Sequence, residues 1–406
     1  MARESLPARW GGYLLLERLA TGGMAEVYLA IDESALGGRR FVVVKRVRED
    51  YGADPEYAQF FLTEGRVSLL CHHPNLPFAY ELGEADGRAF LVLEYLRGHA
   101  VLQVLRAVAT AGRGVGIASA AALGIGIARA LEHLHALTDV DGTPLHVIHR
   151  DVSPHNVIVA PGGVVKLIDL GIARAAIQSH RTETGVVKGK YAYMAPEQLG
   201  LAAQLDGRAD LFSLGAMMHE LLVGRALFQG SSDLDTCERV RNAPIPHPQT
   251  VRDDVPRAIA DVVMTALERD PDRRWPSAGA FADALEAAAV RANAWPSEAG
   301  LWSEVVSLCG PPARPEIEQG VLAWKDRRLP SPRLSPRAQR EGTVMEASPP
   351  IEEIEDQPSE PVDDPDAPKA PLIVPETPRP RDPALSYYLH VGAVKEGEEE
   401  DPEKKK

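Results

Sequence analysis

The sequence predicts an α+β protein with a strand-rich first lobe, a helix-rich second lobe and a disordered C-terminal tail. Short apolar runs between Gly-containing turns dominate up to about residue 96. Apolar residues at helical spacing dominate from about residue 97 to residue 290. Near residue 310 the composition changes to proline and acidic residues. A strand-rich segment followed by a helix-rich one is typical of the α+β class.

The first lobe is predicted to contain four strands and one helix. The helix is expected at 57–70, where Phe60, Phe61, Val67 and Leu70 recur at helical spacing. The strands are expected where apolar and β-branched residues cluster between turns. These four segments are residues 13–20, 26–32, 40–47 and 90–96.

The second lobe is predicted to be mostly helical. Two apolar runs, 147–159 and 164–171, indicate strands, and a polar loop interrupts the first of them. A cleft between two such lobes is a natural place for a ligand. The segments with helical spacing are residues 117–137, 210–224, 258–270 and 280–294.

These patterns divide the chain into four parts. Residues 1–12 are an N-terminal extension. Residues 13–290 are the globular unit, with a first lobe to about residue 96 and a second lobe from about residue 97. Residues 291–310 are a helical extension that either packs on the second lobe or belongs to the tail, and residues 311–406 are the tail.

The tail differs in composition from the rest of the chain. It holds 18 of the 33 prolines, and its 21 acidic and 14 basic residues give it a net charge of −7. Such a segment cannot bury enough apolar surface to offset the entropy that is lost on ordering, so we predict that it is disordered. Its short Pro-rich and acidic motifs suit the docking of partner proteins.

Charge and cysteine content disfavour several classes of protein. The net charge of −14 disfavours binding to nucleic acid or to an anionic membrane surface. Three scattered cysteines are too few for a disulfide framework or a zinc site, and they fit the reducing cytoplasm, where we expect the protein. No signal peptide is recognisable. The apolar stretch between Arg113 and Arg129 is too short to span a bilayer.

Three features of the first lobe suit phosphate binding, although each is weak alone. Gly22 and Gly23 would let backbone N–H groups approach a phosphate, but two glycines in a hairpin usually form only a turn. Lys45 ends an apolar run, and a buried lysine needs an anionic partner. An edge lysine that points to solvent is an equal alternative. Glu64 would be the anion, although a lone helical glutamate is usually a surface residue.

The strongest chemical signal lies in the second lobe. His149, Arg150 and Asp151 are followed by Asn156, five residues after the aspartate. Asp169 comes directly after a predicted strand. Carboxylate and amide oxygens are hard ligands, so this set suits Mg²⁺ and a phosphate-bearing substrate.

Together these elements resemble the signature set of the eukaryotic-type serine/threonine protein kinase family. Further matches follow in the family's order: Tyr193–Glu197 resembles its Y-M-A-P-E, and Asp210 resembles the aspartate of its D-x-W-S-L-G. Arg274 resembles the late arginine that pairs with the A-P-E glutamate. The resemblance covers about residues 13–290, and the local sequences are similar to those of bacterial, especially myxobacterial, members.

The resemblance implies a bilobal protein-kinase fold with ATP and Mg²⁺ between the lobes. Lys45 would contact the α- and β-phosphates, and Glu64 would hold Lys45. Asp151 would orient the substrate hydroxyl and accept its proton, while Asn156 and Asp169 would hold Mg²⁺. The residues implied to surround the nucleotide are Leu19, Ala20, Gly22, Gly23, Val27, Val43, the hinge Glu94–Leu96 and the gatekeeper Leu93.

Three departures from the family pattern look tolerable. Ala20 and Ala25 stand where the glycine-rich loop of the family has glycine. One added methyl group should leave ATP binding intact and stiffen the loop slightly. Leu170 replaces the phenylalanine of D-F-G, which keeps an apolar residue beside the metal ligand.

Two further departures touch the site directly. Ser153 stands where the catalytic loop of the family has lysine, and Lys190 stands where its substrate-binding loop has threonine. We predict an exchange of roles, in which Lys190 returns the positive charge to the γ-phosphate and Ser153 provides the hydroxyl beside Asp151. An equal alternative is that Lys190 points to solvent and recognises acidic substrate residues.

The resemblance also implies an activation loop between Asp169 and Glu197. Ser179, Thr182 and Thr184 are its candidate phosphorylation sites. Arg150 would pair with a phosphate there, because arginine binds phosphoryl oxygens tightly. A loop that is ordered without phosphate is the competing prediction.

The function implied is that of a serine/threonine protein kinase, which transfers the γ-phosphoryl of MgATP to protein substrates in bacterial signalling. One rival is a catalytically weak or dead pseudokinase that binds ATP as a signalling scaffold. Retention of Lys45, Asp151 and Asp169 argues against it. Tyrosine stays open as an acceptor, because Ser153 replaces the lysine that marks serine/threonine kinases.

Overall fold

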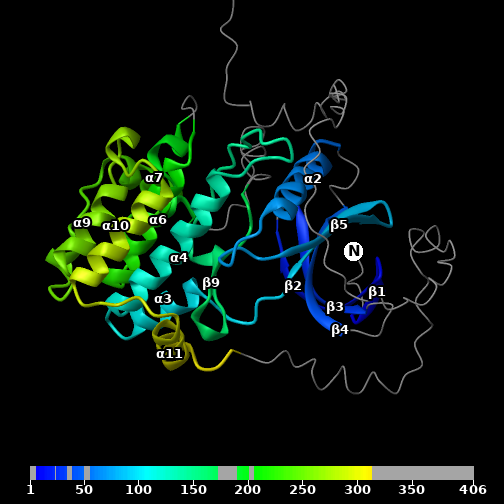
Figure 1. The fold of residues 1–406 in the computed structure, drawn as a ribbon, viewed down its shortest axis with the longest axis horizontal. Coiled ribbons are helices and arrows are strands. Elements are labelled where there is room, and N and C mark those ends of the chain that lie inside the picture. The colour runs from blue at the N-terminus through cyan, green and yellow to red at the C-terminus, as the bar shows by residue number, and fades with distance from the viewer. Residues whose placement is uncertain are drawn as a thin grey trace, which may run out of the picture.

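The computed structural model of the protein describes residues 6–22, 24–33, 39–49, 55–171, 190–200 and 205–312. Within these ranges a lobe built on a sheet, drawn in blue, lies beside a lobe built of helices, drawn in cyan to yellow (Figure 1). The chain passes from one to the other after residue 94. This arrangement confirms the predicted α+β class and the strand-rich and helix-rich lobes.

The first lobe is a six-stranded antiparallel sheet with the strand order β1-β2-β3-β4-β6-β5. Its first strand lies before residue 13 and pairs with the second, so part of the predicted N-terminal extension joins the sheet. The strands are β1 (Ala8–Trp10), β2 (Tyr13–Thr21), β3 (Ala25–Glu33), β4 (Arg39–Val47), β5 (Ala79–Ala85) and β6 (Arg88–Glu94).

The helix α2 (Pro55–Leu70) covers one face of this sheet (Figure 1). Phe61 of α2 packs there against Ala25 and Leu91, while Tyr28 and Val92 belong to a separate apolar cluster. Because successive residues of a strand point to opposite faces, the sheet presents two different surfaces. The face under α2 is the one that carries the chemistry described below.

The second lobe is helical, as predicted. Its core surrounds α4, whose neighbours include α6, α10 and α11. Among the described residues α4 has the length and apolar composition of a membrane-crossing helix, but much of it is enclosed in this core. The helices are α3 (Val101–Thr110), α4 (Ile117–His135), α6 (Arg208–Val223), α7 (Asp233–Asn242), α8 (Pro248–Val251), α9 (Arg257–Ala266), α10 (Ala278–Arg291) and α11 (Glu298–Cys309).

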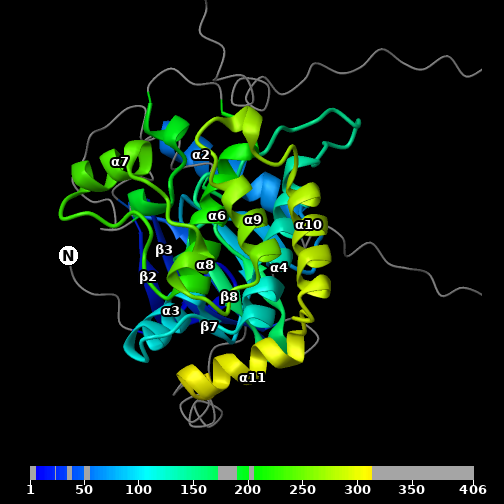
Figure 2. The same cartoon turned by 90° about the vertical axis from the view of Figure 1, so that its left-hand side faces the viewer.

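The helix α3 was not predicted, although its sequence carries the signal. Val101, Val104, Leu105 and Val108 are buried, and their spacing is that of one helical face. The helix α11 lies on the helical lobe, where it contacts α3 and α4, so the predicted helical extension packs on this lobe (Figure 2). The described residues end at 312, and the predicted disordered tail lies almost entirely outside them.

A small three-stranded sheet stands between the main sheet and the helices. It has the order β7-β8-β9, formed by β7 (His99–Ala100), β8 (Val157–Val159) and β9 (Val165–Leu167). The 3₁₀ turn η1 (Pro154–Asn156) leads into β8, and Asp169 follows two residues after β9. This hairpin therefore places the two predicted metal ligands, Asn156 and Asp169, at the same end of neighbouring strands. The turn of the hairpin is η2 (Pro161–Gly163).

Candidate active site

Lys45 lies on the sheet face under α2, where it meets two carboxylates. In the sheet register it stands opposite Val27 of β3 and Leu91 of β6, so the three side chains share one face. Its Nζ lies 2.6 Å from Glu64 Oε1 and 3.1 Å from Asp169 Oδ1. The alternative in which Lys45 points to solvent is therefore wrong.

The Lys45–Glu64 ion pair connects the sheet to α2. Glu64 is only 6% exposed, so the surface alternative for this glutamate is wrong as well. Burial alone would lower the pKa of Lys45, but the carboxylates of Asp169 and Glu64 hold it above its ordinary value. Lys45 is therefore a fixed cation at the junction of the two lobes.

A buried aspartate of α6, Asp210, shapes the loop that carries Asp151. Its two carboxylate oxygens accept hydrogen bonds from the backbone N–H groups of Arg150, at 2.7 Å, and His149, at 2.8 Å. Arg150 has a left-handed backbone with φ +64°, which costs about 1–3 kcal/mol for a residue other than glycine. The hydrogen bonds to Asp210 offset that strain.

His135, at the end of α4, holds the carboxylate of Asp210 in place. Its Nε2 lies 2.9 Å from Asp210 Oδ2. Burial alone would raise the pKa of Asp210, but the hydrogen bond and charge of His135 help to hold it below its ordinary value. The sequence offered no signal for His135, because its partner lies 75 residues further along the chain.

His149 ties the same loop to the segment that carries Asp169. Its ring Nδ1 accepts a hydrogen bond from the backbone N–H of Asp151 at 3.3 Å, so Nε2 carries the proton and donates it to the Ile168 carbonyl at 3.2 Å. Burial lowers the pKa of His149, which favours this neutral form. A Cβ on Gly171 would lie 2.6 Å from the carbonyl oxygen of His149, so only glycine fits there.

Asp151 is the point on which two side chains converge. Asn156 Nδ2 donates to Asp151 Oδ2 at 2.7 Å and to its backbone carbonyl at 2.8 Å. Lys190 Nζ lies 2.7 Å from the same Oδ2, and Lys190 is only 7% exposed. The alternative in which Lys190 points to solvent is therefore wrong.

Ser153 does not make the contact predicted for it. The residue is buried, and its Oγ has no hydrogen-bond partner among the residues that the structure describes. The Oδ2 atom of Asp151 already accepts hydrogen bonds from Asn156 and Lys190. The lysine half of the predicted exchange thus has a geometric basis, and the serine half has none.

Asn156 and Asp169 suit the predicted role of Mg²⁺ ligands. Because Asn156 donates its amide nitrogen to Asp151, its Oδ1 is the atom that can bind a cation. The Asp169 side chain is 49% exposed, and its backbone is left-handed with φ +58°. Ile168 N–H donates to the Asn156 carbonyl at 2.8 Å, which holds the two ligands close together. Such oxygen donors are what Mg²⁺ prefers.

The glycine-rich segment forms the turn between β2 and β3. Gly22 N–H donates to the Ala25 carbonyl at 2.8 Å, and the Gly22 carbonyl accepts from Arg48 at 3.3 Å. Gly23 lies outside the described residues. The other residues predicted to surround the nucleotide here are Leu19 and Ala20, which are exposed, and Val27 and Val43, which are partly buried on the Lys45 face.

The predicted hinge begins where β6 ends. Glu94 pairs through Oε2 with Lys166 of β9 at 2.9 Å and accepts from the Phe78 N–H at 3.1 Å. Lys166 thus joins the hinge to the strand that precedes Asp169, a contact that sequence analysis missed. Leu96 is partly buried, and its predicted backbone contact with adenine stays a prediction.

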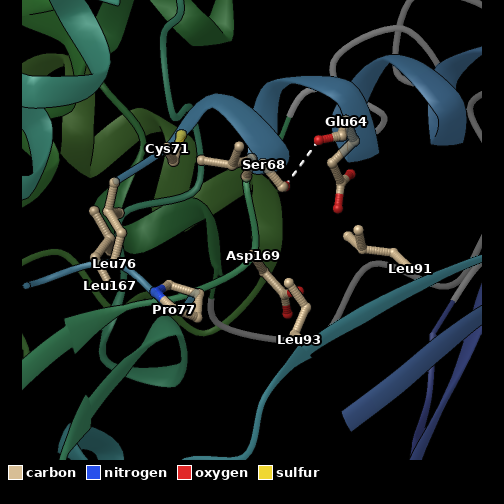
Figure 3. Close-up of a pocket in the computed structure, with 10 residues that line it drawn as sticks. Glu64, Ser68, Cys71, Leu76, Pro77, Leu91, Leu93, Leu167 and Asp169 are labelled. Atoms are coloured by element: carbon tan, nitrogen blue, oxygen red, sulfur yellow. Dashed lines mark hydrogen bonds between the residues drawn. The ribbon is translucent and has the colours of Figure 1, made fainter. Parts of the chain in front are cut away.

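A cavity opens behind the predicted gatekeeper, between α2 and the strands of both lobes (Figure 3). Glu64 and Asp169 reach its edge, so it is continuous with the site of the charged residues. The rest of the lining is mostly apolar. It consists of Ser68, Cys71, Leu76, Pro77, Leu91, Leu93, Leu167 and Leu170.

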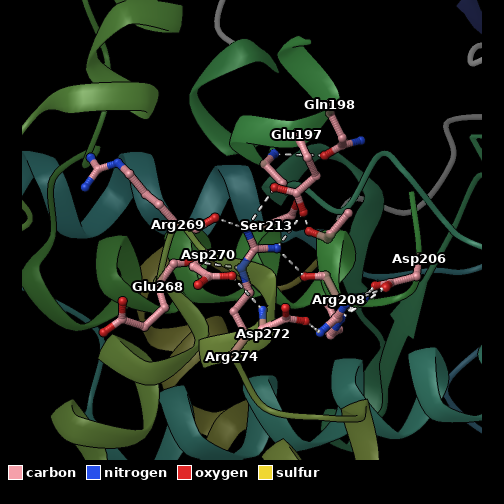
Figure 4. A network of polar contacts seen from close by, with 12 residues as sticks. Glu197, Gln198, Asp206, Arg208, Ser213, Glu268, Arg269, Asp270, Asp272 and Arg274 are labelled. Carbon is pink, nitrogen blue, oxygen red and sulfur yellow. Dashed lines mark hydrogen bonds and ion pairs between the residues drawn. The ribbon is translucent and has the colours of Figure 1, made fainter. Parts of the chain in front are cut away.

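Arg274 and Glu197 form a bidentate ion pair in the helical lobe. The guanidinium nitrogens of Arg274 lie 2.6 and 2.8 Å from the two carboxylate oxygens of Glu197. The same guanidinium donates to the backbone carbonyls of Arg208, Glu268 and Arg269, so it forms the centre of the network in Figure 4. This contact confirms the predicted pairing.

The guanidinium of Arg150, unlike that of Arg274, makes no ion pair of this kind within the described part of the chain. It is half-buried, and it forms no hydrogen bond or ion pair with any residue that the structure describes. Burial lowers the pKa of Arg150. The candidate phosphorylation sites Ser179, Thr182 and Thr184 lie outside the described residues, so pairing of a phosphate with Arg150 stays a prediction.

A sequence profile described as the protein kinase domain matches residues 13–285. The chain is 38% identical to the tyrosine-protein kinase MasK of Myxococcus xanthus over 277 residues. This alignment covers 68% of this chain and 43% of MasK. It is 34% identical over 292 residues to the serine/threonine-protein kinase PknA of Mycobacterium tuberculosis, which covers 70% and 63%. With PrkC of Bacillus subtilis, a serine/threonine-protein kinase, the identity is 32% over 270 residues, which covers 66% and 39%.

The fold is similar to that of solved structures. The kinase domain of PknI from Mycobacterium tuberculosis superposes with a TM-score of 0.52 and 25% sequence identity, over 71% of this chain and all of that domain. The matched part of the chain thus spans less than two thirds of the length of the full-length relatives named here. The helix α11 lies beyond the region that the profile matches.

Proposed function

This chain belongs to the protein kinase domain family, and we propose that it transfers the γ-phosphoryl group of MgATP to serine and threonine hydroxyls of proteins. The observation that carries the proposal is the meeting of two charged groups in one site. Lys45, Glu64 and Asp169 form the first, and Asp151 with Asn156 forms the second. Hydrogen bonds through His149 and Ile168 join the two groups.

Each residue has a task that its geometry suits. Lys45 would bind the phosphates of the nucleotide, and Glu64 and Asp169 already hold its ammonium in place. Asn156 and Asp169 would hold Mg²⁺, which neutralises charge on the phosphates when it is bound. Asp151 would accept a hydrogen bond from the acceptor hydroxyl, orient it and take its proton. Positioning and charge stabilisation supply most of the rate enhancement in such a reaction.

The pseudokinase alternative is not favoured. A scaffold that only binds ATP needs Lys45 but has no use for a supported base. Here Asp151 lies in a loop that buried Asp210 and neutral His149 hold in a strained backbone. Strain of this kind persists where the surrounding structure imposes it, and it clusters at functional sites.

Phosphorylation of protein tyrosine is a second candidate. The relative that is 38% identical, MasK, is a tyrosine-protein kinase by name. In addition, Ser153 occupies the position at which the resemblance to serine/threonine kinases calls for lysine. The serine/threonine kinases PknA and PrkC are 34% and 32% identical, so relatives of both kinds match the chain.

The proposal also covers the cellular location of the protein, its substrates and the role of its tail. We infer that the chain acts in bacterial signalling in the cytoplasm, on protein substrates, with the tail as a docking segment for partners. Support comes from the bacterial serine/threonine-protein kinases among its relatives and from the composition of residues 311–406. Comparing the activity of the full chain with that of a chain ending at residue 312, on the same acceptors, tests the role of the tail.

The central experiment is incubation of the full chain with labelled ATP, Mg²⁺ and a set of generic acceptors, namely casein, histone and myelin basic protein. Mass spectrometry then identifies the modified residues. Phosphoserine and phosphothreonine that disappear in Asp151→Asn are expected. Phosphotyrosine as the main product would select the second candidate. Nucleotide binding without any transfer would favour the pseudokinase and overturn the proposal.

A further inference from the structure

A buried lysine from outside the catalytic loop stands at the reacting end of the site. Lys190 lies 39 residues after Asp151 in the chain, yet its Nζ is 2.7 Å from Asp151 Oδ2. Its side chain is 7% exposed and that of Asp151 is 11% exposed. A buried ammonium is costly unless it is paired, so the position of Lys190 depends on an anion at this point.

Lys190 is presented from a fixed platform. It begins the 3₁₀ turn η3 (Lys190–Tyr193), in which Ala192 is buried. Tyr193 Oη donates to Glu220 Oε2 of α6 at 2.5 Å, which anchors the end of this turn. The backbone beside Asp151 is therefore held, while the long, flexible stem of lysine allows its ammonium to reach a second anion nearby.

Among the described residues, the other charged groups of the site do not supply a cation for the transferring phosphoryl group beside Asp151. The ammonium of Lys45 is shared between Glu64 and Asp169, on the side where the nucleotide phosphates and Mg²⁺ would bind. Near Asp151 the catalytic loop itself contributes Ser153, which carries no charge. Phosphoryl transfer places negative charge on the oxygens of the moving group, so a donor is needed at that end of the site.

We propose that Lys190 is the cation that binds the transferring phosphoryl group, and that its ion pair with Asp151 is the resting arrangement that ATP breaks. This inference rests on the proposed kinase activity. The more highly charged γ-phosphate draws the ammonium away from Asp151, and the Oδ2 atom becomes accessible to the acceptor hydroxyl. The site thus gains its base and its phosphate-binding cation in one movement.

The step balances without a further reactant. The bond between the γ-phosphorus and the oxygen that bridges it to the β-phosphate breaks, and its electron pair stays on ADP. The acceptor oxygen forms the new bond to phosphorus, and its proton passes to Asp151 and then to solvent. Lys190 keeps its proton throughout and donates hydrogen bonds to the non-bridging oxygens.

A binding experiment tests the contact without turnover. Calorimetry compares the full chain with Lys190→Gln, which keeps a donor but loses the charge, and with Lys190→Arg, for Mg²⁺ with ADP or with the non-hydrolysable analogue AMP-PNP. We expect Lys190→Gln to weaken AMP-PNP binding about ten-fold and ADP binding less than about two-fold, the size of one lost charged hydrogen bond. Lys190→Arg should lose much less.

The control is Arg239→Gln, which removes a cation from an exposed pair with Asp235 on α7. It should bind both nucleotides like the wild type. Equal weakening of both nucleotides by Lys190→Gln, or no weakening at all, would overturn the inference. If Lys190→Gln does not fold in a thermal melt, Lys190→Met is measured in the same way and carries the same expected result.

A turnover experiment separates a phosphate contact from a merely structural role. Lys190→Gln should lower kcat about a hundred-fold with little change in the KM of the acceptor. Adding Ser153→Lys to that variant should restore part of kcat, because it returns a cation beside Asp151 from the other segment. Strictly additive losses would sink the inference. A wild type that phosphorylates nothing would instead overturn the proposed function, and the inference with it.

Discussion

At the scale of single residues, Asp151 is the position on which the proposed chemistry depends most. We predict that Asp151→Asn lowers the transfer rate by about 10²–10⁴, the usual effect of losing a positioned base. The amide keeps the shape and a hydrogen bond to Lys190. Lys45 and Asp169, which would bind the nucleotide phosphates and Mg²⁺, are untouched, so the affinity for MgADP should change little. Rate and affinity are measured on the same protein.

The control for this variant is Asp261→Asn, in an exposed aspartate of α9. It should transfer phosphate at the wild-type rate. Turnover near that of the wild type in Asp151→Asn would remove Asp151 from the mechanism.

Two adjacent arginines provide a matched test of the ion pair below the site. Arg274 is buried and forms a bidentate ion pair with Glu197, whereas Arg273 is exposed and lies 3.8 Å from Glu268. Arg274→Met should lower the free energy of unfolding by about 3–5 kcal/mol, because it removes a buried guanidinium and leaves the partly buried carboxylate of Glu197 without its partner. Arg273→Met should change it by less than about 0.5 kcal/mol.

Urea denaturation of both variants measures the difference. Equal effects of the two substitutions would show that the pair with Glu197 contributes no more than a surface contact.

At the scale of elements, α11 is a helix that lies beyond the region matched by the family profile. Leu301 and Val305 are buried against the helical lobe, and the carboxylate oxygens of Glu304 accept hydrogen bonds from the N–H of Gly116, the residue before α4, at 3.0 and 3.3 Å. A Cβ on Gly163 of η2 would lie 1.8 Å from the Glu298 carbonyl oxygen, so glycine is required where α11 crosses the hairpin. The predicted Mg²⁺ ligands flank this hairpin, so contact with α11 holds their supporting strands in place.

We therefore predict that a chain ending at residue 312 keeps the stability of the full chain, whereas one ending at residue 297 loses several kcal/mol. Val305→Asp should cost about 3 kcal/mol or more, because it buries an unpaired carboxylate. Ser303→Asp, on the exposed side of the same helix, is the control and should stay within about 0.5 kcal/mol. Thermal melts distinguish these cases. A loss of stability at 312 would instead make residues beyond 312 part of the fold.

At the scale of the whole molecule, buried histidines make stability depend on pH. Burial lowers the pKa of His149 and His219 below 6.5 in the folded state. Below pH 6.5 the unfolded chain binds protons that the folded chain does not. Their contribution to stability is therefore complete above pH 6.5 and is lost progressively as the pH falls toward the lower folded pKa values.

Glu220 acts in the opposite direction, because burial raises its pKa above 4.5. A single variant isolates one histidine from that background. His219 Nε2 bonds to the Pro246 carbonyl at 2.9 Å, and His219→Gln can keep this contact without titrating. We predict that the free energy of unfolding falls less steeply between pH 7 and pH 5 in His219→Gln than in the wild type. An unchanged slope would exclude His219 as a source of the pH dependence.

The amino-acid sequence by itself determined the fold class, the order of the motifs and the identity of the charged residues at the site. Strand and helix patterns depend on neighbours in the chain, so most strands and helices of both lobes were predictable, although β5, α3 and α7 were missed. The pairing of Arg274 with Glu197 followed from the resemblance to the kinase family. The boundaries of short elements such as β1 were not predictable, because three residues carry too little periodicity.

Only the tertiary structure decided where side chains point. Motif spacing left Lys190 facing either solvent or the γ-phosphate, and packing of η3 on α6 placed it beside Asp151. The same holds for Asp210, whose carboxylate holds the backbone of a loop 60 residues away. Such contacts arise between segments that are distant in the chain, where local pattern carries no information. Burial of charge then selects the arrangement in which each buried charge has its partner.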